Sequence, residues 1–228
     1  MRAILAAIMI TFGFSPSANA DGPVVVELFT SQGCSSCPPA DAMLHELAYR
    51  DDVIALALHV DYWDYIGWTD SFASPAFTER QHRYARAAGS RTVYTPQFII
   101  DGRDHVIGAD GMKVMDEIRA NERIGSPVTL DVTATSGGLT IAAQSTERTD
   151  MVVQLVRYMP ESTVDILRGE NRGRTISYAN VVTNWDVLTR WNGSSPLRLS
   201  ADISGTLPAV VIIQEDRNGP ILAAQRVN

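Results

Sequence analysis

Residues 31–41 read SQGCSSCPPAD and contain the only two cysteines of the chain, Cys34 and Cys37. A structural disulfide stabilises mainly by closing a long loop, and a bond between these two would close only a four-residue ring. Tetrahedral zinc would need two further thiol or imidazole ligands, and the four histidines are scattered along the chain. The spacing therefore favours a redox-active pair, and we expect neither a metal nor a cofactor.

The segments on either side of the cysteines predict a strand, a helix and a second strand. Residues 23–29 form a short valine-rich apolar run, which suits a buried strand. Apolar residues recur at helical spacing over residues 39–49, and residues 53–60 form another continuous apolar run. A strand, a helix and a strand in this order are typical of a parallel sheet, with the cysteines at the start of its first helix.

The next part of the chain extends this pattern as far as residue 125. Ser74 followed by Pro75 predicts the start of a second helix. Residues 97–100 and 105–107 predict two antiparallel strands, and Asp110 predicts the cap of a third helix. The predicted order is β-α-β-α-β-β-α.

From residue 126 onward, alternating apolar residues are separated by Gly, Asn and Asp turns. This pattern predicts an antiparallel sandwich or partial barrel. The expected fold class is thus an α/β domain over residues 21–125, followed by an all-β, sandwich-like domain over residues 126–228.

The first twenty residues predict export. Residues 1–20 combine a basic start at Arg2, an apolar stretch too short to span a bilayer and an Ala-Asn-Ala cleavage signal. We therefore expect a cleaved signal peptide and a periplasmic or secreted protein without membrane insertion of the mature chain. The net charge of −7 argues against nucleic acid and anionic membranes as partners.

Two motifs carry a resemblance to the thioredoxin superfamily. The first is SQGCSSCPPAD after the strand of residues 24–29, and the second is VYTPQFIIDG over residues 93–102. Together with HVDYWDYIGW and RGENRGRT, they make the chain similar to a family of exported, thioredoxin-like bacterial proteins that has no established biochemical role. The resemblance implies that the α/β domain of residues 21–125 is thioredoxin-like. It also implies a cis bond between Thr95 and Pro96, whose backbone pairs with an incoming extended peptide.

The resemblance also implies roles for the site residues. Cys34 would be the attacking sulfur at the exposed start of the helix, and Cys37 the buried resolving sulfur. The positive end of the helix dipole would stabilise the thiolate, although the prolines after Cys37 predict that the helix begins only there. Glu27 is a candidate for the buried carboxylate that takes the proton of the resolving thiol; the alternative is a sheet residue that points to solvent.

Three further groups of residues have a functional and a plainer interpretation. An aromatic loop containing Tyr62, Trp63 and Trp68 could bind an apolar segment of a partner, or cover the joint between the two domains. The RGENRGRT segment could form an anion site, hold the domain interface or be a charged hairpin turn. For the last group, His59, Asp61 and Asp64, we favour a structural role over metal binding. The full set of residues considered in RGENRGRT is Arg168, Glu170, Asn171, Arg172 and Arg174.

The leading functional hypothesis is a thiol-disulfide oxidoreductase that exchanges disulfides with cysteine-containing envelope proteins. Because the chain has no third cysteine, an external redox partner must recycle the pair. The direction of electron flow is left open by the sequence. Two alternatives use the same cysteines: a copper-binding module, with Met43 and His59 as the nearest additional ligands, and a binding protein with an inert disulfide.

Overall fold

The structure is a computed structural model that describes residues 22–203 and 205–227. The predicted signal peptide, residues 1–20, lies outside the described residues. Among the residues described, no helix is both long and apolar enough to cross a membrane.

The first part of the chain follows the predicted order of helices and strands. Ser74 caps the second helix by accepting a hydrogen bond from the backbone N–H of Ala76, and Asp110 caps the third by accepting one from Lys113. Local sequence signals therefore place these elements correctly. They are β1 (Val24–Thr30), α1 (Pro38–Leu47), β2 (Val53–His59), the short 3-10 helix η1 (Asp64–Ile66), α2 (Pro75–Ala87), β3 (Gln97–Ile100), β4 (Asp104–Ile107) and α3 (Gly111–Asn121).

The rest of the described chain consists of strands and one short 3-10 helix. These elements are β5 (Val128–Thr135), β6 (Gly138–Ser145), β7 (Met151–Asp165), β8 (Thr175–Trp191), β9 (Leu197–Asp202), β10 (Ala209–Glu215), η2 (Asp216–Asn218) and β11 (Ile221–Val227). The predicted boundary after residue 125 falls between α3 and β5.

The strands from both parts of the chain form one large mixed sheet. Its order is β11-β10-β7-β8-β2-β1-β3-β4, and only β5, β6 and β9 form a second, three-stranded sheet. The described residues are mostly β, with three α-helices. The predicted fold class, an α/β thioredoxin-like domain followed by a separate all-β domain, is therefore wrong.

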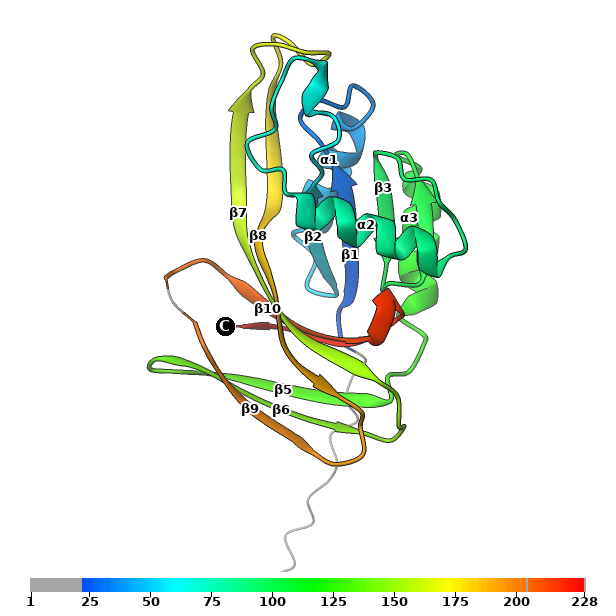
Figure 1. The fold of residues 1–228 in the computed structure, drawn as a ribbon, viewed down its shortest axis with the longest axis vertical. Helices are drawn as coiled ribbons and strands as arrows, with labels where there is room; N and C mark the ends of the chain where they lie inside the picture. Colours follow the sequence, from blue (N-terminus) through cyan, green and yellow to red (C-terminus); the bar gives the residue numbers. More distant parts are fainter. Residues whose placement is uncertain (1–21, 204, 228) are drawn as a thin grey trace, which may run out of the picture.

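The long β7–β8 hairpin causes this difference. β8 pairs in parallel with β2, at Ala57 and Val181, and β7 pairs with both β8 and β10. Irregularities in the β7–β8 register lie at Val153/Gln154 and Arg157/Tyr158, and the hairpin runs almost the whole length of the molecule (Figure 1). Periodicity in a sequence identifies a strand but not its partner, so this pairing could not be predicted.

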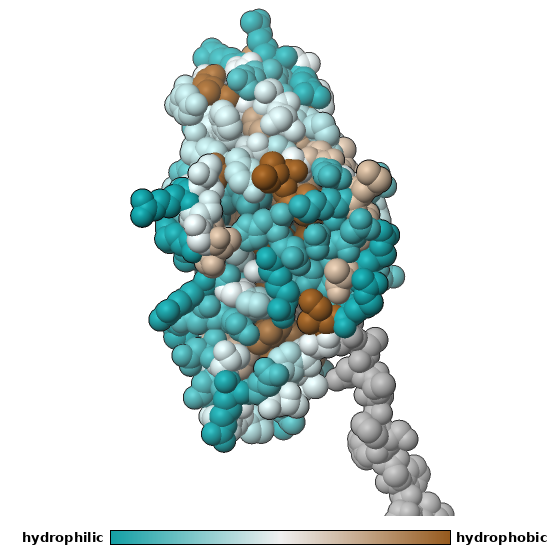
Figure 2. Space-filling model, turned by 90° about the vertical axis from the view of Figure 1, so that its right-hand side faces the viewer, coloured by the Kyte–Doolittle hydropathy of each residue, from teal (hydrophilic) through white to brown (hydrophobic). Residues whose placement is uncertain are grey.

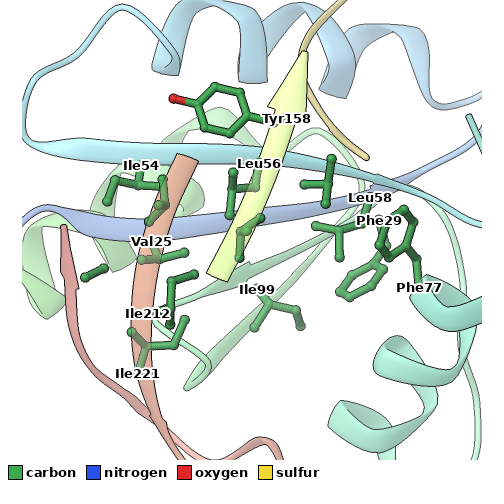
Figure 3. Close-up of a cluster of buried hydrophobic side chains, with 14 of the residues drawn as sticks. Val25, Phe29, Ile54, Leu56, Leu58, Phe77, Ile99, Tyr158, Ile212 and Ile221 are labelled. Atoms are coloured by element: carbon green, nitrogen blue, oxygen red, sulfur yellow. The ribbon is translucent and has the colours of Figure 1, made fainter. Parts of the chain in front are cut away.

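The large sheet buries apolar side chains on both faces. Alternate residues of β1 point to opposite faces, so that Val25 and Phe29 pack toward α2, whereas Val26 and Leu28 pack toward α1. Figure 3 shows the cluster on the α2 face, where Ile212 of β10 and Ile221 of β11 meet residues of β1 and β2. The site described below lies at the end of β1 on the α1 face.

The outer surface is less apolar than the sheet. The face shown in Figure 2 is mainly hydrophilic, and its hydrophobic residues form separate small spots. This view therefore shows no large apolar area for a partner to cover.

Candidate functional site

Cys34 and Cys37 form a disulfide immediately before α1. The sulfur atoms are 2.06 Å apart and the two Cα atoms 5.4 Å apart. As the sequence predicted, the helix begins only after the pair: Cys37 is the N-cap, and Pro38 and Pro39 are the first two helical residues. Because proline has no backbone N–H, the helix offers a Cys34 thiolate fewer donors than a typical helix N-terminus.

The prediction that Cys34 is exposed is wrong. Its exposed fraction is 2%, and that of Cys37 is 0%. The aromatic loop packs against Gly33, the residue before Cys34. A Cβ atom added to Gly33 would lie 3.3 Å from Ile66 Cδ1 and 3.3 Å from Trp63 Cβ. Glycine at position 33 permits this close approach, but the local sequence does not reveal that a distant loop makes it.

The disulfide closes a ring of four residues, 34–37, which we call the cysteine ring. The two serines between the cysteines are the exposed part of this ring. The hydroxyl oxygen of Ser36 lies 3.4 Å from Cys34 Sγ, and because a disulfide sulfur carries no hydrogen, the hydroxyl is the donor. Ser36 therefore supplies a hydrogen bond of the kind that would also stabilise a thiolate at Cys34.

The Thr95–Pro96 peptide bond is cis, as the resemblance implied. The Trp63 indole Nε1–H donates a hydrogen bond to Thr95 Oγ1 at 2.7 Å. Since Trp63 also packs against Gly33, a single side chain connects the cis-proline loop to the residue directly before Cys34.

Glu27 is buried, but it lies on the face of the sheet opposite α1. Its exposed fraction is 0%, which excludes a position facing solvent. Its carboxylate accepts two hydrogen bonds from the Arg80 guanidinium, at 2.6 and 2.9 Å, and one from the Tyr84 hydroxyl at 2.5 Å. Gln214 of β10 continues this network by accepting from Arg80 and donating to Tyr84. Glu27 is thus fully engaged on the α2 side and does not face Cys37.

A different buried carboxyl, Asp41, lies one helical turn after Cys37. Its backbone N–H donates to the Cys37 carbonyl at 3.1 Å, and residues four apart on a helix have neighbouring side chains. Its Oδ1 accepts from the Thr30 hydroxyl at 2.7 Å, whereas Oδ2 has no hydrogen-bond partner in the described part of the chain. Burial raises the pKa of Asp41 to about 7, against the opposing effects of Thr30 and His59. This carboxyl can therefore hold a proton near neutral pH.

His59 and Tyr178 complete a buried polar cluster with Asp41. The two rings are 4.9 Å apart, and both residues interact electrostatically with Asp41. Like Asp41 Oδ2, His59 Nε2 and the Tyr178 hydroxyl have no hydrogen-bond partner among the described residues. We refer to these three residues, together with Asp70, which pairs with His59, as the Asp41 cluster.

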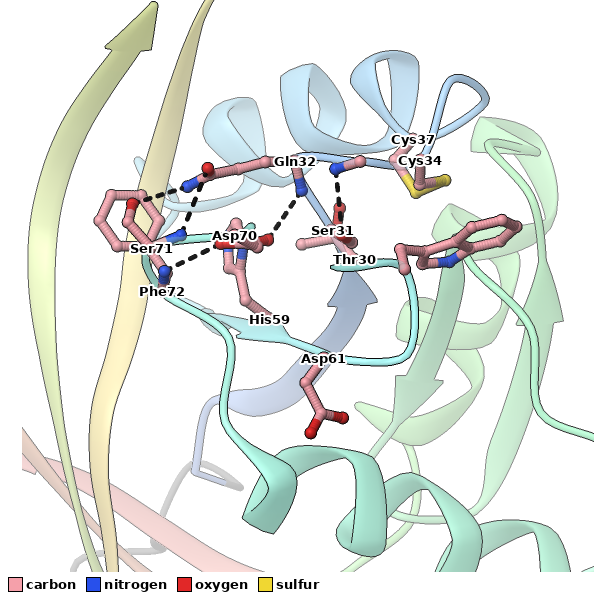
Figure 4. Close-up of polar contacts among 12 residues, drawn as sticks. Thr30, Ser31, Gln32, Cys34, Cys37, His59, Asp61, Asp70, Ser71 and Phe72 are labelled. Atoms are coloured by element: carbon pink, nitrogen blue, oxygen red, sulfur yellow. Dashed lines mark hydrogen bonds and ion pairs between the residues drawn. A yellow bond between two sulfur atoms is a disulfide. The ribbon is translucent and has the colours of Figure 1, made fainter. Parts of the chain in front are cut away.

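Asp70 joins the Asp41 cluster to the segment before the cysteines. Its Oδ2 lies 2.7 Å from His59 Nδ1 and accepts from the backbone N–H of Gln32, also at 2.7 Å (Figure 4). Burial opposes ionisation of Asp70, but His59 and the backbone N–H groups of Gln32 and Phe72 outweigh it and lower the pKa of Asp70. A negative charge is therefore stabilised at Asp70, beside the segment that leads to Cys34.

The aromatic loop packs inward through most of its rings. The Tyr62 hydroxyl donates to Gln81 Oε1, and the Trp68 indole N–H donates to Gln32 Oε1. Trp68 also packs against the β8 cluster around Tyr178, at the joint with the β7–β8 hairpin. Tyr65, with an exposed fraction of 80%, is the most exposed ring in this loop.

The RGENRGRT segment forms the tip of the β7–β8 hairpin and reaches the cysteine ring. Asn171 is buried, with an exposed fraction of 1%, and its side-chain amide donates to the carbonyl oxygens of Gln32 and Cys34 at 2.9 Å each. The prediction of a hairpin turn is confirmed, and this turn also supports the site.

The residues considered for metal binding have other partners. His59 pairs with Asp70, while Asp61 accepts a hydrogen bond from Thr78 on α2. Met43 points toward α3, where its Cε would lie 3.2 Å from a Cβ added to Gly111. Within residues 22–203 and 205–227, no group of three or more His, Cys, Asp or Glu side chains is arranged to hold a metal ion.

The sequence analysis missed Asp41 and Asp70 as site residues, and it considered Asn171 for an anion site or the domain interface but not for a contact with the cysteine segment. Asp41 had a usable signal, because it follows Cys37 by four positions on a predicted helix and would fall on the buried face of that helix. Asp70 and Asn171 reach the site from distant segments, and no local pattern identifies them.

Comparison with known proteins gives the chain a family. The family model described as "Protein of unknown function (DUF1223)" matches residues 25–214. The chain is also similar to a protein from Agrobacterium tumefaciens whose crystal structure was solved by structural genomics; the two are 36% identical, with a TM-score of 0.79 over 92% of this chain and 95% of that one. No curated protein matches the chain. The chain belongs to the DUF1223 family of proteins of unknown function.

Proposed function

We propose that the protein is a thiol-disulfide oxidoreductase whose reactive bond is Cys34–Cys37. The observation that carries this proposal is that Trp63 connects the cis Thr95–Pro96 loop to Gly33, the residue directly before the disulfide-bonded Cys34. This arrangement also supports the resemblance of the site to that of the thioredoxin superfamily. A structural role would not require a cis-proline loop to be connected to a four-residue ring.

When the disulfide form of the protein oxidises a partner dithiol, a thiolate of the partner attacks Cys34 and the Cys34–Cys37 bond breaks. Cys37 leaves as a thiolate and takes up a proton. The second partner thiol then loses its proton and attacks the partner's sulfur of the mixed disulfide, so the bond to Cys34 breaks and Cys34 leaves as a thiolate. The partner is thereby oxidised to a disulfide, and both protein cysteines are reduced. The reverse sequence oxidises the protein. The partner's sulfur must approach over Ser35 and Ser36, the exposed side of the ring.

Asp41 is the proton donor and acceptor that we propose for Cys37, in place of Glu27. Its carboxyl lies one turn from Cys37, keeps Oδ2 without a partner and has a pKa raised to about 7 by burial. A group that titrates near the working pH is suited to proton transfer in both directions.

We also propose that the protein acts outside the cytosol on cysteine-containing envelope proteins, with an external redox partner that recycles it. Disulfides persist in oxidising compartments, and the sequence of residues 1–20 is typical of a signal peptide.

A Cys37→Ser variant tests the function by trapping the mixed disulfide at Cys34. Expressed with its own leader, this variant should become disulfide-linked to client proteins that can be released by dithiothreitol and identified by mass spectrometry. The matched control is Cys34→Ser, which keeps one cysteine but lacks the attacking sulfur. Equal capture by the two variants would contradict the proposal.

The burial of both cysteines favours a second candidate, a binding protein with an inert disulfide. The rate of reduction of the native protein by dithiothreitol separates the two. An oxidoreductase should be reduced under conditions in which the fold stays intact, whereas an inert disulfide should be reduced only as fast as the protein unfolds.

A further inference from the structure

The tip of the β7–β8 hairpin, residues 166–174, is fixed beside the disulfide. Asn171 binds the carbonyl oxygens of Gln32 and Cys34. Gly169, at φ +75°, approaches the aromatic loop so closely that an added Cβ would lie 3.1 Å from Trp68 Cβ. Figure 1 shows this tip next to the segment that joins β2 to α2. Side chains that extend from the tip therefore have a defined position relative to the cysteine ring.

The tip carries an unusual concentration of positive charge. Arg168, Arg172 and Arg174 are all exposed, and Glu170 is the only acidic residue of the tip. Among the described residues, none of these three arginines forms an ion pair with a carboxylate; Arg174 donates to Asn171 Oδ1 at 3.1 Å. By contrast, the chain as a whole has a net charge of −7. The three arginines and one glutamate give the tip a formal charge of +2, opposite in sign to the net charge of the protein.

We propose that the hairpin tip binds an acidic segment of the polypeptide whose cysteine reacts with Cys34. This inference rests on the proposed function and gives it a class of partner. The guanidinium group matches a carboxylate in geometry, and unneutralised arginines next to a reaction centre increase the rate of encounter with an acidic partner. An extended, acidic peptide fits this surface better than a polyanionic membrane or nucleic acid, because the overall negative charge of the protein repels large anionic surfaces.

The test measures how fast Cys34 of the Cys37→Ser variant attacks two synthetic peptides. Each peptide contains one cysteine activated as a 2-pyridyl disulfide, so attack forms the mixed disulfide and releases pyridine-2-thione, which is measured by absorbance. One peptide has aspartates around the cysteine and the other has serines. We expect the acidic peptide to react about tenfold faster at low salt, with the advantage lost at high salt.

The Arg168→Glu/Arg172→Glu double variant, made in the Cys37→Ser background, should lose this advantage. It should react with the serine peptide within about twofold of its parent, because neither arginine side chain makes a hydrogen bond or ion pair within the described structure. The matched control is Arg148→Glu/Arg198→Glu, which changes the net charge equally at two exposed arginines outside the hairpin tip and should retain most of the advantage.

The outcomes separate this inference from the proposed function. If both peptides react at equal rates, or if the control variant loses the advantage as fully as the tip variant, the acidic-partner proposal is wrong and the oxidoreductase proposal stands. If neither peptide reacts faster than with Cys34→Ser, the oxidoreductase proposal fails as well.

Discussion

The two faces of the large sheet each bury a set of charged and polar residues, and the two sets are bonded to different degrees. On the α2 face, the Glu27 carboxylate, the Arg80 guanidinium and the Tyr84 hydroxyl are joined by short hydrogen bonds that extend to Gln214. On the α1 face, the Asp41 cluster leaves three buried polar atoms without a partner among the described residues.

This difference separates a structural network from a chemical one. A buried ion pair with complete bonding holds segments together, and here it joins β1, α2 and β10. Buried polar atoms without partners cost stability, so a protein that keeps them next to a disulfide gains something other than stability from them. We interpret the Glu27 network as structural and the Asp41 cluster as the proton-handling part of the site.

The largest effect on stability is expected when the fully hydrogen-bonded Glu27 network is broken. Arg80→Ala leaves the Glu27 carboxylate buried without its cation, which should lower the free energy of unfolding by about 3–5 kcal/mol. Arg86→Ala is the control, since its ion pair with Glu79 is exposed and is worth less than about 1 kcal/mol. Urea unfolding of both variants measures this difference. A loss of less than about 1 kcal/mol for Arg80→Ala would show that the network does not stabilise the fold.

A second test concerns the pH dependence that Asp41 contributes. Folded Asp41 keeps its proton up to about pH 7 because burial raises its pKa, whereas an aspartate in the unfolded chain loses its proton near pH 4. Between these values the unfolded state binds fewer protons, so this group makes the folded protein less stable as the pH rises, by at most about 1.4 kcal/mol per pH unit. Asp41→Asn should remove this contribution. Compared with the unmutated protein, the free energy of unfolding of the variant should therefore increase by about 2 kcal/mol between about pH 5 and pH 6.5.

Asp101→Asn is the matched control for Asp41→Asn. Burial also raises the pKa of Asp101 to about 7, and its carboxylate accepts a hydrogen bond from the backbone N–H of Val25. Both variants should alter the pH dependence of stability, but only Asp41→Asn should change the pH profile of disulfide reduction in the native protein. Identical reduction profiles would remove Asp41 from the mechanism.

The same chemical change at two tyrosines should have opposite effects. Tyr84→Phe deletes a hydroxyl that bonds Glu27, Arg80 and Gln214, and it should destabilise the protein by about 1–3 kcal/mol. Tyr178→Phe deletes a buried hydroxyl without a partner among the described residues, and it should be neutral or stabilise by up to about 1 kcal/mol. Thermal unfolding at equal protein concentration measures both. Equal destabilisation would mean that the two faces do not differ as we describe.

The smallest effect concerns Trp63, which packs against Gly33, the residue directly before the cysteine ring. Trp63→Phe removes the hydrogen bond to Thr95 and part of the packing over Gly33, so it should cost about 0.5–1.5 kcal/mol while dithiothreitol reduces the native protein faster. Trp185→Phe is its counterpart in the Glu27 network, where the indole N–H donates to Gln154 and the ring lies against Arg80. This variant should have a similar cost and an unchanged rate of reduction.

Part of the site could be predicted from short stretches of sequence. The position of the cysteines before a helix, the late start of that helix at Pro38 and the cis bond before Pro96 all depend on neighbouring residues or on the motif resemblance. The carboxyl near Cys37 was assigned to the wrong residue, because alternation along β1 places Glu27 on the α2 face and β1 alone does not indicate which face receives α1.

The sequence by itself determined the local elements: strands from continuous apolar runs, helices from their periodicity and caps, and turns from glycine and asparagine. Only the tertiary structure decided that β8 pairs with β2, that the hairpin tip supports the cysteine ring through Asn171 and that the aromatic loop packs against Gly33. The physical reason is that secondary structure depends on interactions within a few residues, whereas these contacts join segments far apart in the chain. Their formation depends on how well two surfaces fit, which no single segment encodes.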